Sequence, residues 1–323
     1  MPDLPSMFEE GLAPPPQAGA RPGLASLRRV LEAHRAWLEG RPGGQRASLG
    51  GVVLAEAALD KVNLERADLN AANFIDASLS GANLSGASLH FTDFSNATLI
   101  QADLSKGELL DAKLDHALLG GTSFCEARLL NTSLRSANLR EAHMLEATME
   151  NCDFTRAVLR AARLLQVKAF DCNFAEAELE GANFYHSVLR CCKLPGVSAS
   201  GSNWATATVQ NCEFRRSDLS SAVFDRADLR QCSFWRADLR NCSFQNARLN
   251  GADMQGADLS GSRFHNATTM SANLRGADLR AAQGLTQSQL GQALTDRDTI
   301  LPDGSHGPYL QGSGAHRPCN AAR

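Results

Sequence analysis

The sequence lacks long hydrophobic runs, and this absence limits the kinds of protein that it can encode. No apolar stretch approaches the roughly 20 residues that a membrane-spanning helix needs, so we expect no membrane span. The opening residues MPDLPSMFEE lack the basic and apolar regions of a signal peptide. This favours a cytoplasmic protein and leaves secretion by a leaderless route open. In the cytoplasm the 9 cysteines would be reduced thiols.

Residue patterns that carry catalytic chemistry are missing as well. The chain has no Gly-rich phosphate loop and no nucleophile elbow, and its 8 histidines fall at no metal-ligand spacing. The 21% of charged residues is ordinary for a globular protein, and the net charge is only −3. We therefore expect no enzyme, no cofactor, no bound metal and no direct nucleic-acid binding.

The sequence does contain a five-residue repeat that runs through most of its length. Counted from Leu54 to Leu279, every fifth residue belongs to a series of 46 centres, of which 41 are Leu, Phe or Met. From Val52 to Ala277, the residue two places before each centre is always Ala, Cys, Ser, Thr, Val or Gly. The positions between carry mainly polar and charged residues, which favours their exposure to water.

A period of five fits neither a helix nor a long strand, but it fits a chain that turns a corner every five residues. Four such sides close a square coil, with the centres inside and the small residues packed beside them. Stacked coils would pair their backbones at the spacing of neighbouring strands, about 4.8 Å. The centres predict about 11–12 coils, at four centres per coil. Proline and glycine between Pro195 and Val209 predict a bulge or projecting loop there.

The phenylalanines support a four-sided coil, because centres four repeats apart would share one face. The Phe centres occupy only two such faces, which lie opposite each other. One face carries Phe74, Phe94, Phe154, Phe174, Phe214 and Phe234, and the other carries Phe124, Phe184, Phe224, Phe244 and Phe264 with Trp204. Two opposed aromatic columns between two leucine columns would fill a narrow square core evenly.

The motifs that carry this pattern, such as ADLRQ, ADLRN, ADLSG and ANLRG, resemble those of the pentapeptide repeat family. The resemblance covers residues 52 to about 282, and the flanks look similar to those of bacterial members. It implies an all-β solenoid, a right-handed quadrilateral β-helix, with short capping helices at both ends. The family has no common catalytic residues, so the resemblance implies no active site.

The flanks complete a division of the chain into five segments. An open solenoid end exposes core and unpaired strand groups, so each end needs a cap. The expected segments are a disordered N-terminus (1–22), an N-terminal capping helix and loop (23–50), the repeat region (51–282), a C-terminal capping helix and loop (283–305) and a loose tail (306–323).

Both capping helices have sequence signals. The first has an apolar stripe that Gly40 and Pro42 end, and its members are Leu24, Leu27, Leu31, His34 or Ala33, Trp37 and Leu38. The stripe is expected to cover the first coil. The second begins at a capping box formed by Thr286 and Gln289 and extends to about Leu294.

Five cysteines recur at the small position once in every four repeats, namely Cys152, Cys172, Cys192, Cys212 and Cys232. Such thiols would stand in a line about 4.8 Å apart, whereas a metal site needs sulfurs that converge on one ion at about 2.3 Å. We interpret them, together with Cys242 on the opposite side, as small core hydrophobes that are unreactive. Cys125 and Cys191 are expected to face outward and Cys319 to lie in the tail, so these three are the modifiable thiols.

Charge is distributed unevenly along the predicted rod. Residues 51–150 carry 14 acidic and 7 basic residues, whereas residues 151–280 carry 13 and 16. The densest basic stretch surrounds Trp235, and an exposed Trp flanked by Arg has the composition of an interface hot spot. The alternative is a solvated face with one incidental aromatic residue. The candidate protein-binding residues are Arg215, Arg216, Arg230, Trp235, Arg236 and Arg240.

Two functions suit a rod without catalytic groups. The first is a rigid protein-binding scaffold or a secretion-associated accessory factor, with a protein partner that the sequence does not identify. The alternative follows from the resemblance: quinolone-resistance members mimic duplex DNA and occupy the DNA site of gyrase, which would make DNA gyrase the partner. Those members are strongly acidic dimers with shorter rods, whereas this chain has a net charge of −3. A coil end would also offer a contact for homo-oligomers.

Overall fold

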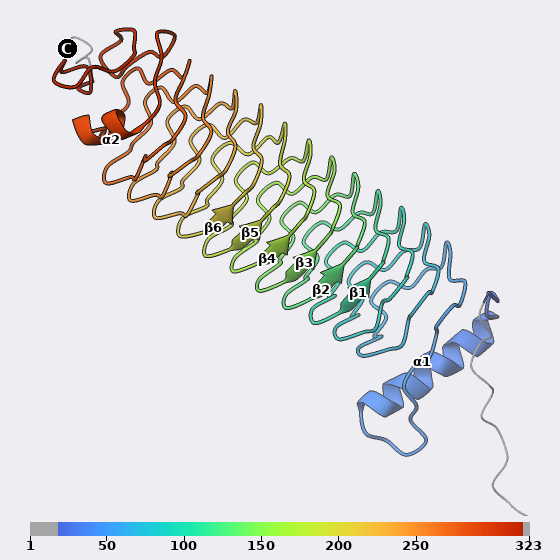
Figure 1. Ribbon diagram of the computed structural model, residues 1–323. Coiled ribbons are helices and arrows are strands. Elements are labelled where there is room, and N and C mark those ends of the chain that lie inside the picture. Colours follow the sequence, from blue (N-terminus) through green and yellow to red (C-terminus); the bar gives the residue numbers. More distant parts are fainter. Residues whose placement is uncertain (1–18, 319–323) are drawn as a thin grey trace, which may run out of the picture.

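A computed structural model describes residues 19–318 and shows a long solenoid with a short helix at each end (Figure 1). Helix α1 (Leu24–Leu38) precedes the first coil, and helix α2 (Gln287–Gln292) follows the last. Between the two helices the chain winds coil upon coil along one axis (Figure 1). The fold class expected from the sequence, a β-solenoid with short capping helices, is confirmed.

Each coil has four sides, and each side is one five-residue repeat. Parallel bridges join residues that are four repeats apart, from Ser48 with Asp68 to Arg263 with Gln283. On one side of six successive coils the bridges extend into three-residue strands, which form a single parallel sheet in the order β1 to β6. The strands are β1 (Glu108–Leu110), β2 (Arg128–Leu130), β3 (Thr148–Glu150), β4 (Lys168–Phe170), β5 (Val188–Arg190) and β6 (Thr208–Gln210). At four repeats per coil, the bridged residues 48–283 make nearly twelve coils, as predicted.

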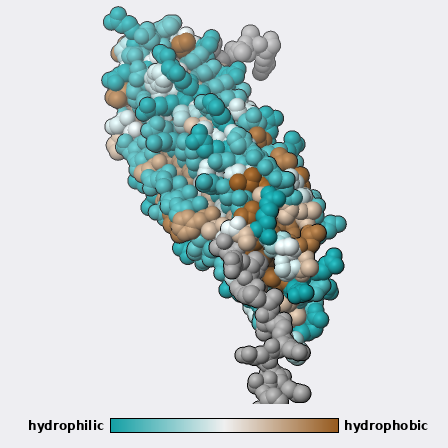
Figure 2. Space-filling model, turned by 90° about the vertical axis from the view of Figure 1, so that its right-hand side faces the viewer, coloured by the Kyte–Doolittle hydropathy of each residue, from teal (hydrophilic) through white to brown (hydrophobic). Residues whose placement is uncertain are grey.

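A β-turn closes most corners of the coil. The N–H group three residues after a centre donates to the carbonyl of that centre, as Ala57 does to Leu54 at 3.1 Å. Asp or Asn before a centre accepts a hydrogen bond from the backbone after it, as Asn73 does from Ile75 at 2.9 Å. These polar residues therefore support the corners and face outward. Figure 2 shows the resulting surface, which is mostly hydrophilic, with hydrophobic residues gathered toward the N-terminal end.

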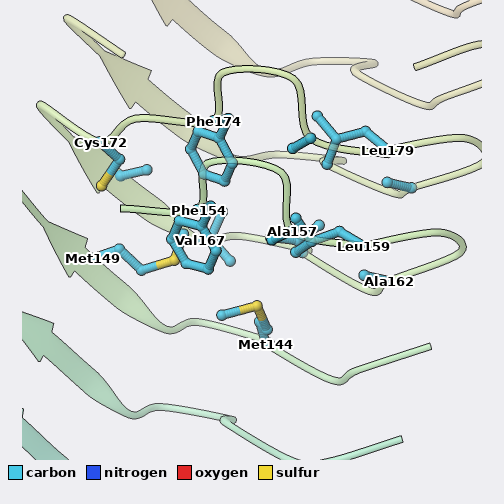
Figure 3. Packing of buried hydrophobic residues seen from close by; sticks show 14 of the residues in the cluster. Met144, Met149, Phe154, Ala157, Leu159, Ala162, Val167, Cys172, Phe174 and Leu179 are labelled. Atoms are coloured by element: carbon cyan, nitrogen blue, oxygen red, sulfur yellow. The ribbon is translucent and has the colours of Figure 1, made fainter. Parts of the chain in front are cut away.

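The core is a continuous stack of buried side chains from successive coils. Figure 3 shows Phe174 directly above Phe154 and Leu179 above Leu159. The ring centroids of Phe154 and Phe174 are 4.7 Å apart, and the two planes differ by only 4°. All the Phe centres and Trp204 are fully buried. The two predicted aromatic columns are confirmed.

The bulge or projecting loop expected between Pro195 and Val209 is absent, so this expectation is wrong. Bridges continue through the region, for example from Ser198 to Asp218. Pro195 occupies a corner position at which, in most coils, the N–H group has no backbone partner, so proline costs little there. Gly196 occupies the next corner position with a φ of +66°, which glycine adopts easily. Both residues suit the coil rather than interrupt it.

Volume is also balanced in this region. The small centre Ala199 is followed by the large centre Trp204, and both are fully buried. The indole Nε1–H of Trp204 donates to Ser202 Oγ at 2.7 Å, which satisfies its polar group inside the core. The small centre and the large centre therefore compensate for each other on neighbouring sides of the coil.

Helix α1 packs against the first coil through only part of its predicted stripe. Leu27 and His34 are buried, whereas Leu24 is 88% exposed. The prediction that the apolar stripe covers the first coil is therefore wrong for Leu24. The backbone N–H of Ala47 donates to His34 Nδ1 at 3.0 Å, and burial lowers the pKa of His34. A groove of about 650 Å³ lies between α1 and the first coil, and Leu31 and Leu59 are among its lining residues. The helix is therefore a partial lid.

Helix α2 covers the last coil more completely. The predicted capping box is present, since Gln289 N–H donates to Thr286 Oγ1 at 3.2 Å and Thr286 N–H donates to Gln289 Oε1 at 2.6 Å. The side-chain amide of Gln289 also donates to the carbonyls of Phe264 at 3.0 Å and Ala267 at 2.8 Å. The Phe264 carbonyl also accepts from Ala267 N–H at 2.9 Å, whereas the Ala267 carbonyl has no further coil to pair with. One glutamine therefore both starts the helix and closes this end of the solenoid.

The ends of the described chain are more closely attached than the sequence suggested. Gly19 N–H donates to the carbonyl of Gly51 at 2.7 Å, although residues 1–22 were expected to be disordered. In the expected loose tail, Gly307 N–H donates to the carbonyl of Thr299 at 2.8 Å, and Ala315 is buried. Backbone hydrogen bonds therefore attach both segments to the coil ends despite their Pro- and Gly-rich composition. Residues 1–18 and 319–323 of these expected segments, including Cys319, lie outside the described residues.

Candidate functional site

Trp235 lies between two arginines on the outside of the rod. The guanidinium carbon of Arg216 is 5.0 Å from the centroid of the indole ring, and that of Arg236 is 4.5 Å away. Cation–π contacts fall within about 6 Å of the ring centroid, so both arginines contribute. We call these three residues the Trp235 surface.

The coil geometry explains this arrangement. Trp235 follows the centre Phe234, and Arg216 N–H donates to the carbonyl of Trp235 at 3.0 Å across neighbouring coils. Arg216 and Arg236 occupy the left-handed corner position, with φ values of +56° and +53°. Arg216 therefore lies one coil from Arg236 at the same corner, and the indole packs against both.

The surface also has favourable electrostatics for a negatively charged partner. No ion pair engages Arg216 or Arg236 among residues 19–318. Arg215 lies beside them, but its Nε is 3.8 Å from Glu213 Oε2, so its charge is partly balanced. The two arginines on the indole therefore carry the uncompensated positive charge.

The other two candidate residues lie elsewhere. Arg230 and Arg240 follow centres that are two repeats apart, so they belong to opposite sides of the four-sided coil. Each pairs with the aspartate two residues before it: Arg230 Nη2 is 2.7 Å from Asp228 Oδ2, and Arg240 Nη2 is 2.5 Å from Asp238 Oδ2. Hydrogen bonds from Arg240 hold the pKa of Asp238 below its usual range.

The predicted six-residue group is thus divided by the structure. Arg216, Trp235 and Arg236 come together with Arg215 beside them, and the remaining two arginines flank them as neutralised pairs. The sequence did contain the signal for these pairs. In ADLR the Asp and Arg lie two residues apart on one extended side, so both side chains point outward together.

The cysteine column is internal, as expected. Cys152, Cys172, Cys192, Cys212 and Cys232 are at most 1% exposed, and all are free thiols. The Sγ of Cys232 donates to the carbonyl of Val209 at 3.0 Å, so the thiols bond to core backbone. Burial raises the pKa of the Cys242 thiol on the opposite side, which disfavours its reactive thiolate form. Among residues 19–318, no group of three or more His, Cys, Asp or Glu side chains could hold a metal ion.

Thiol labelling should separate the two classes of cysteine. In a Cys319→Ser variant, we expect the exposed Cys191 and the half-exposed Cys125 to react with a maleimide within minutes, while the buried thiols react only after unfolding. Mass spectrometry of peptides from native and denatured samples would measure this. Rapid native labelling of Cys192, the immediate neighbour of Cys191, would show that the core opens and would contradict the prediction.

The described part of the chain contains no helix that is both long and apolar enough to cross a membrane. No curated protein matches the chain.

Several solved structures are similar to the chain. HetL, a pentapeptide repeat protein involved in heterocyst differentiation regulation from the cyanobacterium Nostoc sp. strain PCC 7120, is 25% identical, with 84% of this chain and 97% of HetL covered and a TM-score of 0.25. QnrB1, a plasmid-mediated fluoroquinolone resistance protein, is 23% identical, with 52% of this chain and 89% of QnrB1 covered and a TM-score of 0.33. Rfr23 from the cyanobacterium Cyanothece 51142 is 29% identical, with 33% of this chain and 61% of Rfr23 covered and a TM-score of 0.16.

The family assignment comes from the repeat sequence itself. Eight copies of the sequence pattern described as pentapeptide repeats match the chain, and together they cover more than half of it. The matched residues are 47–86, 72–109, 82–121, 108–144, 117–156, 170–203, 207–236 and 236–268. The chain therefore belongs to the pentapeptide repeat family.

Proposed function

We propose that this protein is a non-catalytic rod that serves as a protein-binding scaffold or accessory factor, and that a partner docks on the Trp235 surface. The observation that carries the proposal is the indole held between two guanidinium groups. A large aromatic side chain with adjacent arginines is the composition typical of binding hot spots. The uncompensated positive charge of Arg216 and Arg236 favours an acidic partner.

The solenoid supports such a role because it fixes the surface before binding. Each outward side chain starts from a corner whose backbone is hydrogen-bonded to a neighbouring coil, as Arg236 N–H is to the carbonyl of Gln255 at 2.9 Å. The adjacent centre Phe234 is fully buried and stacks on Phe214 with centroids 5.1 Å apart. A preorganised surface loses less conformational entropy when a partner binds.

DNA mimicry with gyrase as the partner is the alternative function. One column of the rod does carry four aspartates on successive coils, Asp218, Asp238, Asp258 and Asp278, joined by parallel bridges. However, two of these carboxylates form ion pairs at 2.5 Å with Arg240 and Arg280. The column therefore presents less negative charge than a mimic of DNA phosphates requires, and we favour the scaffold.

Variants of the Trp235 surface should separate binding from stability. Trp235→Ala is expected to weaken partner binding by about 2 kcal/mol or more, as truncation of a hot-spot residue does. Arg216→Glu with Arg236→Glu should weaken it further by reversing the local charge. Recovery of partners in a pull-down from the source cells, with melting temperatures of the same samples, would measure both properties.

The matched control is Arg248→Glu, which reverses an exposed arginine on a different side of the coil. It should melt normally and recover partners as the unmodified protein does. If the Trp235 surface variants also recover every partner, the surface is only solvated and the proposal fails. A gyrase supercoiling assay on the same proteins tests the alternative, because inhibition that survives these substitutions would favour DNA mimicry.

A further inference from the structure

A second surface feature lies on the side of the rod opposite Trp235. The residues after the centres of five successive coils are all apolar, whereas outward positions are polar in most of the chain. These residues are Cys125, Leu145, Leu165, Tyr185 and Ala205, and we call them the apolar stripe. They follow the second aromatic series, which contains Phe124 and Phe184, and Trp235 follows the first.

The stripe is continuous in three dimensions. Glu126 N–H donates to the carbonyl of Leu145 at 2.8 Å, and Gln166 N–H donates to the carbonyl of Tyr185 at 3.0 Å, so successive members lie on adjacent coils. Four spacings of about 4.8 Å give the stripe a length of about 19 Å. Leu145 is 41% exposed and Tyr185 is 38% exposed, so apolar area remains open to water.

Polar residues bound the stripe at both ends and along both edges. Glu65 and Asp225 occupy the same register in coils beyond it. Along one edge lie His143 and Arg163, which are joined to each other by a parallel bridge. Along the other edge lie Glu126, Glu146, Gln166 and His186 at corner positions. Glu126 is paired with Lys106 of the same edge at 3.7 Å. Glu146 is therefore the carboxylate of this edge without an ion pair among residues 19–318, and it lies across the stripe from the edge with His143 and Arg163.

We propose that the apolar stripe is the contact surface of a side-by-side homodimer, with two rods parallel about a two-fold axis along their length. This symmetry brings each stripe residue against the same residue of the second copy. It also places the edge with His143 and Arg163 of one rod opposite the edge with Glu146 of the other. His143 would then face Glu146 of the second copy, and Arg163 would face Gln166.

An antiparallel arrangement about Leu165 fits less well, because it would place Arg163 against the Arg163 of the second copy. In the parallel arrangement, no like charges of the two copies face each other within the stripe. They do so only beyond its ends. There Asp225 would face its own copy directly after the stripe, and Glu65 would face its own copy three coils before Cys125. Such a small interface should be weak, with a dissociation constant on the order of 10 µM.

The dimer also leaves both Trp235 surfaces on the outside, since the two features lie on opposite sides of each rod. Dimerisation and partner binding are therefore independent, and either proposal can fail without the other. Sedimentation velocity of the full chain from about 1 to 200 µM tests the dimer directly, because this range brackets the expected constant. We expect the mass to rise from 34.6 kDa toward twice that value.

A matched pair of variants tests the surface. Leu145→Glu should raise the dissociation constant at least tenfold, whereas Ile100→Glu should leave it unchanged. Ile100 is 42% exposed, close to the 41% of Leu145, and also follows a centre, but it lies on a different side of the coil. Equal melting temperatures for the two variants would show that folding is not the cause.

A disulfide between the Cys125 residues of two copies would report the relative orientation of the two rods. With Cys191 and Cys319 both replaced by serine, mild oxidation by copper phenanthroline should join Cys125 of two copies, as two thiols form one disulfide and pass two electrons to the copper reagent. Retaining Cys191 in place of Cys125 should give no cross-link. A chain that stays monomeric at the highest concentration, a response to Ile100→Glu equal to that of Leu145→Glu, or a dimer without the Cys125 cross-link would overturn the proposal.

Discussion

Replacing Phe234 with alanine is expected to lower the free energy of unfolding by about 3–5 kcal/mol, because it leaves a cavity in a core that cannot collapse around it. Phe234 is fully buried, stacks on Phe214 and meets Phe224 edge-on at 6.1 Å. Both neighbours are held by the coils above and below, so they cannot move to fill the space. The loss should therefore lie at the upper end of core substitutions.

Hydrogen exchange would locate this effect along the rod. In a solenoid each coil contacts only its neighbours, so the amides around Phe214 and Phe234 should lose protection while those around Leu79 keep it. Trp235→Ala is the matched control, because it removes a large aromatic group from the next position on the outside. A similar loss of protection in both variants would mean that the buried stack contributes little beyond the surface contacts.

Deletion of residues 23–42 is expected to cause concentration-dependent association and a lower melting temperature. The deletion removes α1, whose buried Leu27 and His34 cover the first coil, and it exposes apolar core together with unpaired backbone groups. Light scattering during gel filtration would measure the association. Carrying out the deletion in the Leu145→Glu background would separate association through the coil end from association through the apolar stripe.

The exposed Leu24 provides the control for this deletion. Leu24→Ala should leave the protein as stable and as soluble as before, since that side chain is 88% exposed and covers nothing. If the deleted chain melts at the same temperature as the full chain and does not associate, α1 has no capping role. In that case the groove beside it would be the more important feature of this end.

The repeating part of the fold was predictable because each position of the five-residue unit has one environment throughout. Leu139 and Leu159, for example, are four repeats apart and both fully buried. The spacing of four repeats per coil also predicted the Phe columns and the cysteine column. The capping box at Thr286 was equally clear, because its two hydrogen bonds are local in sequence. Features that depend on a fixed spacing were therefore accessible without a structure.

The remaining features depend on contacts that spacing alone does not determine. Pro195 and Gly196 suggested an interruption of the coil. However, the first of these corner positions needs no backbone N–H donor, and the second has a positive φ throughout the coils. In the candidate surface, the spacing placed Arg216 near Arg236. The spacing in ADLR also put Arg230 and Arg240 on the same outer side as the aspartates two residues before them, but it did not show that the side chains of each pair meet. Surface pairing depends on side-chain rotamers, which the repeat leaves free.

The closure of the coil after four repeats also has a consequence for how such a protein can change in length. Loss or gain of four repeats, such as one turn between Asp228 and Arg248, would shorten or lengthen the rod and keep every downstream side chain on its original side. Loss or gain of a single repeat would rotate the whole C-terminal part by a quarter turn. If it fell between Ala205 and Arg216, it would move the Trp235 surface to a side adjacent to the apolar stripe while the core pattern stayed intact. The angle between the two surfaces is thus set in steps of one repeat and is independent of the length of the rod.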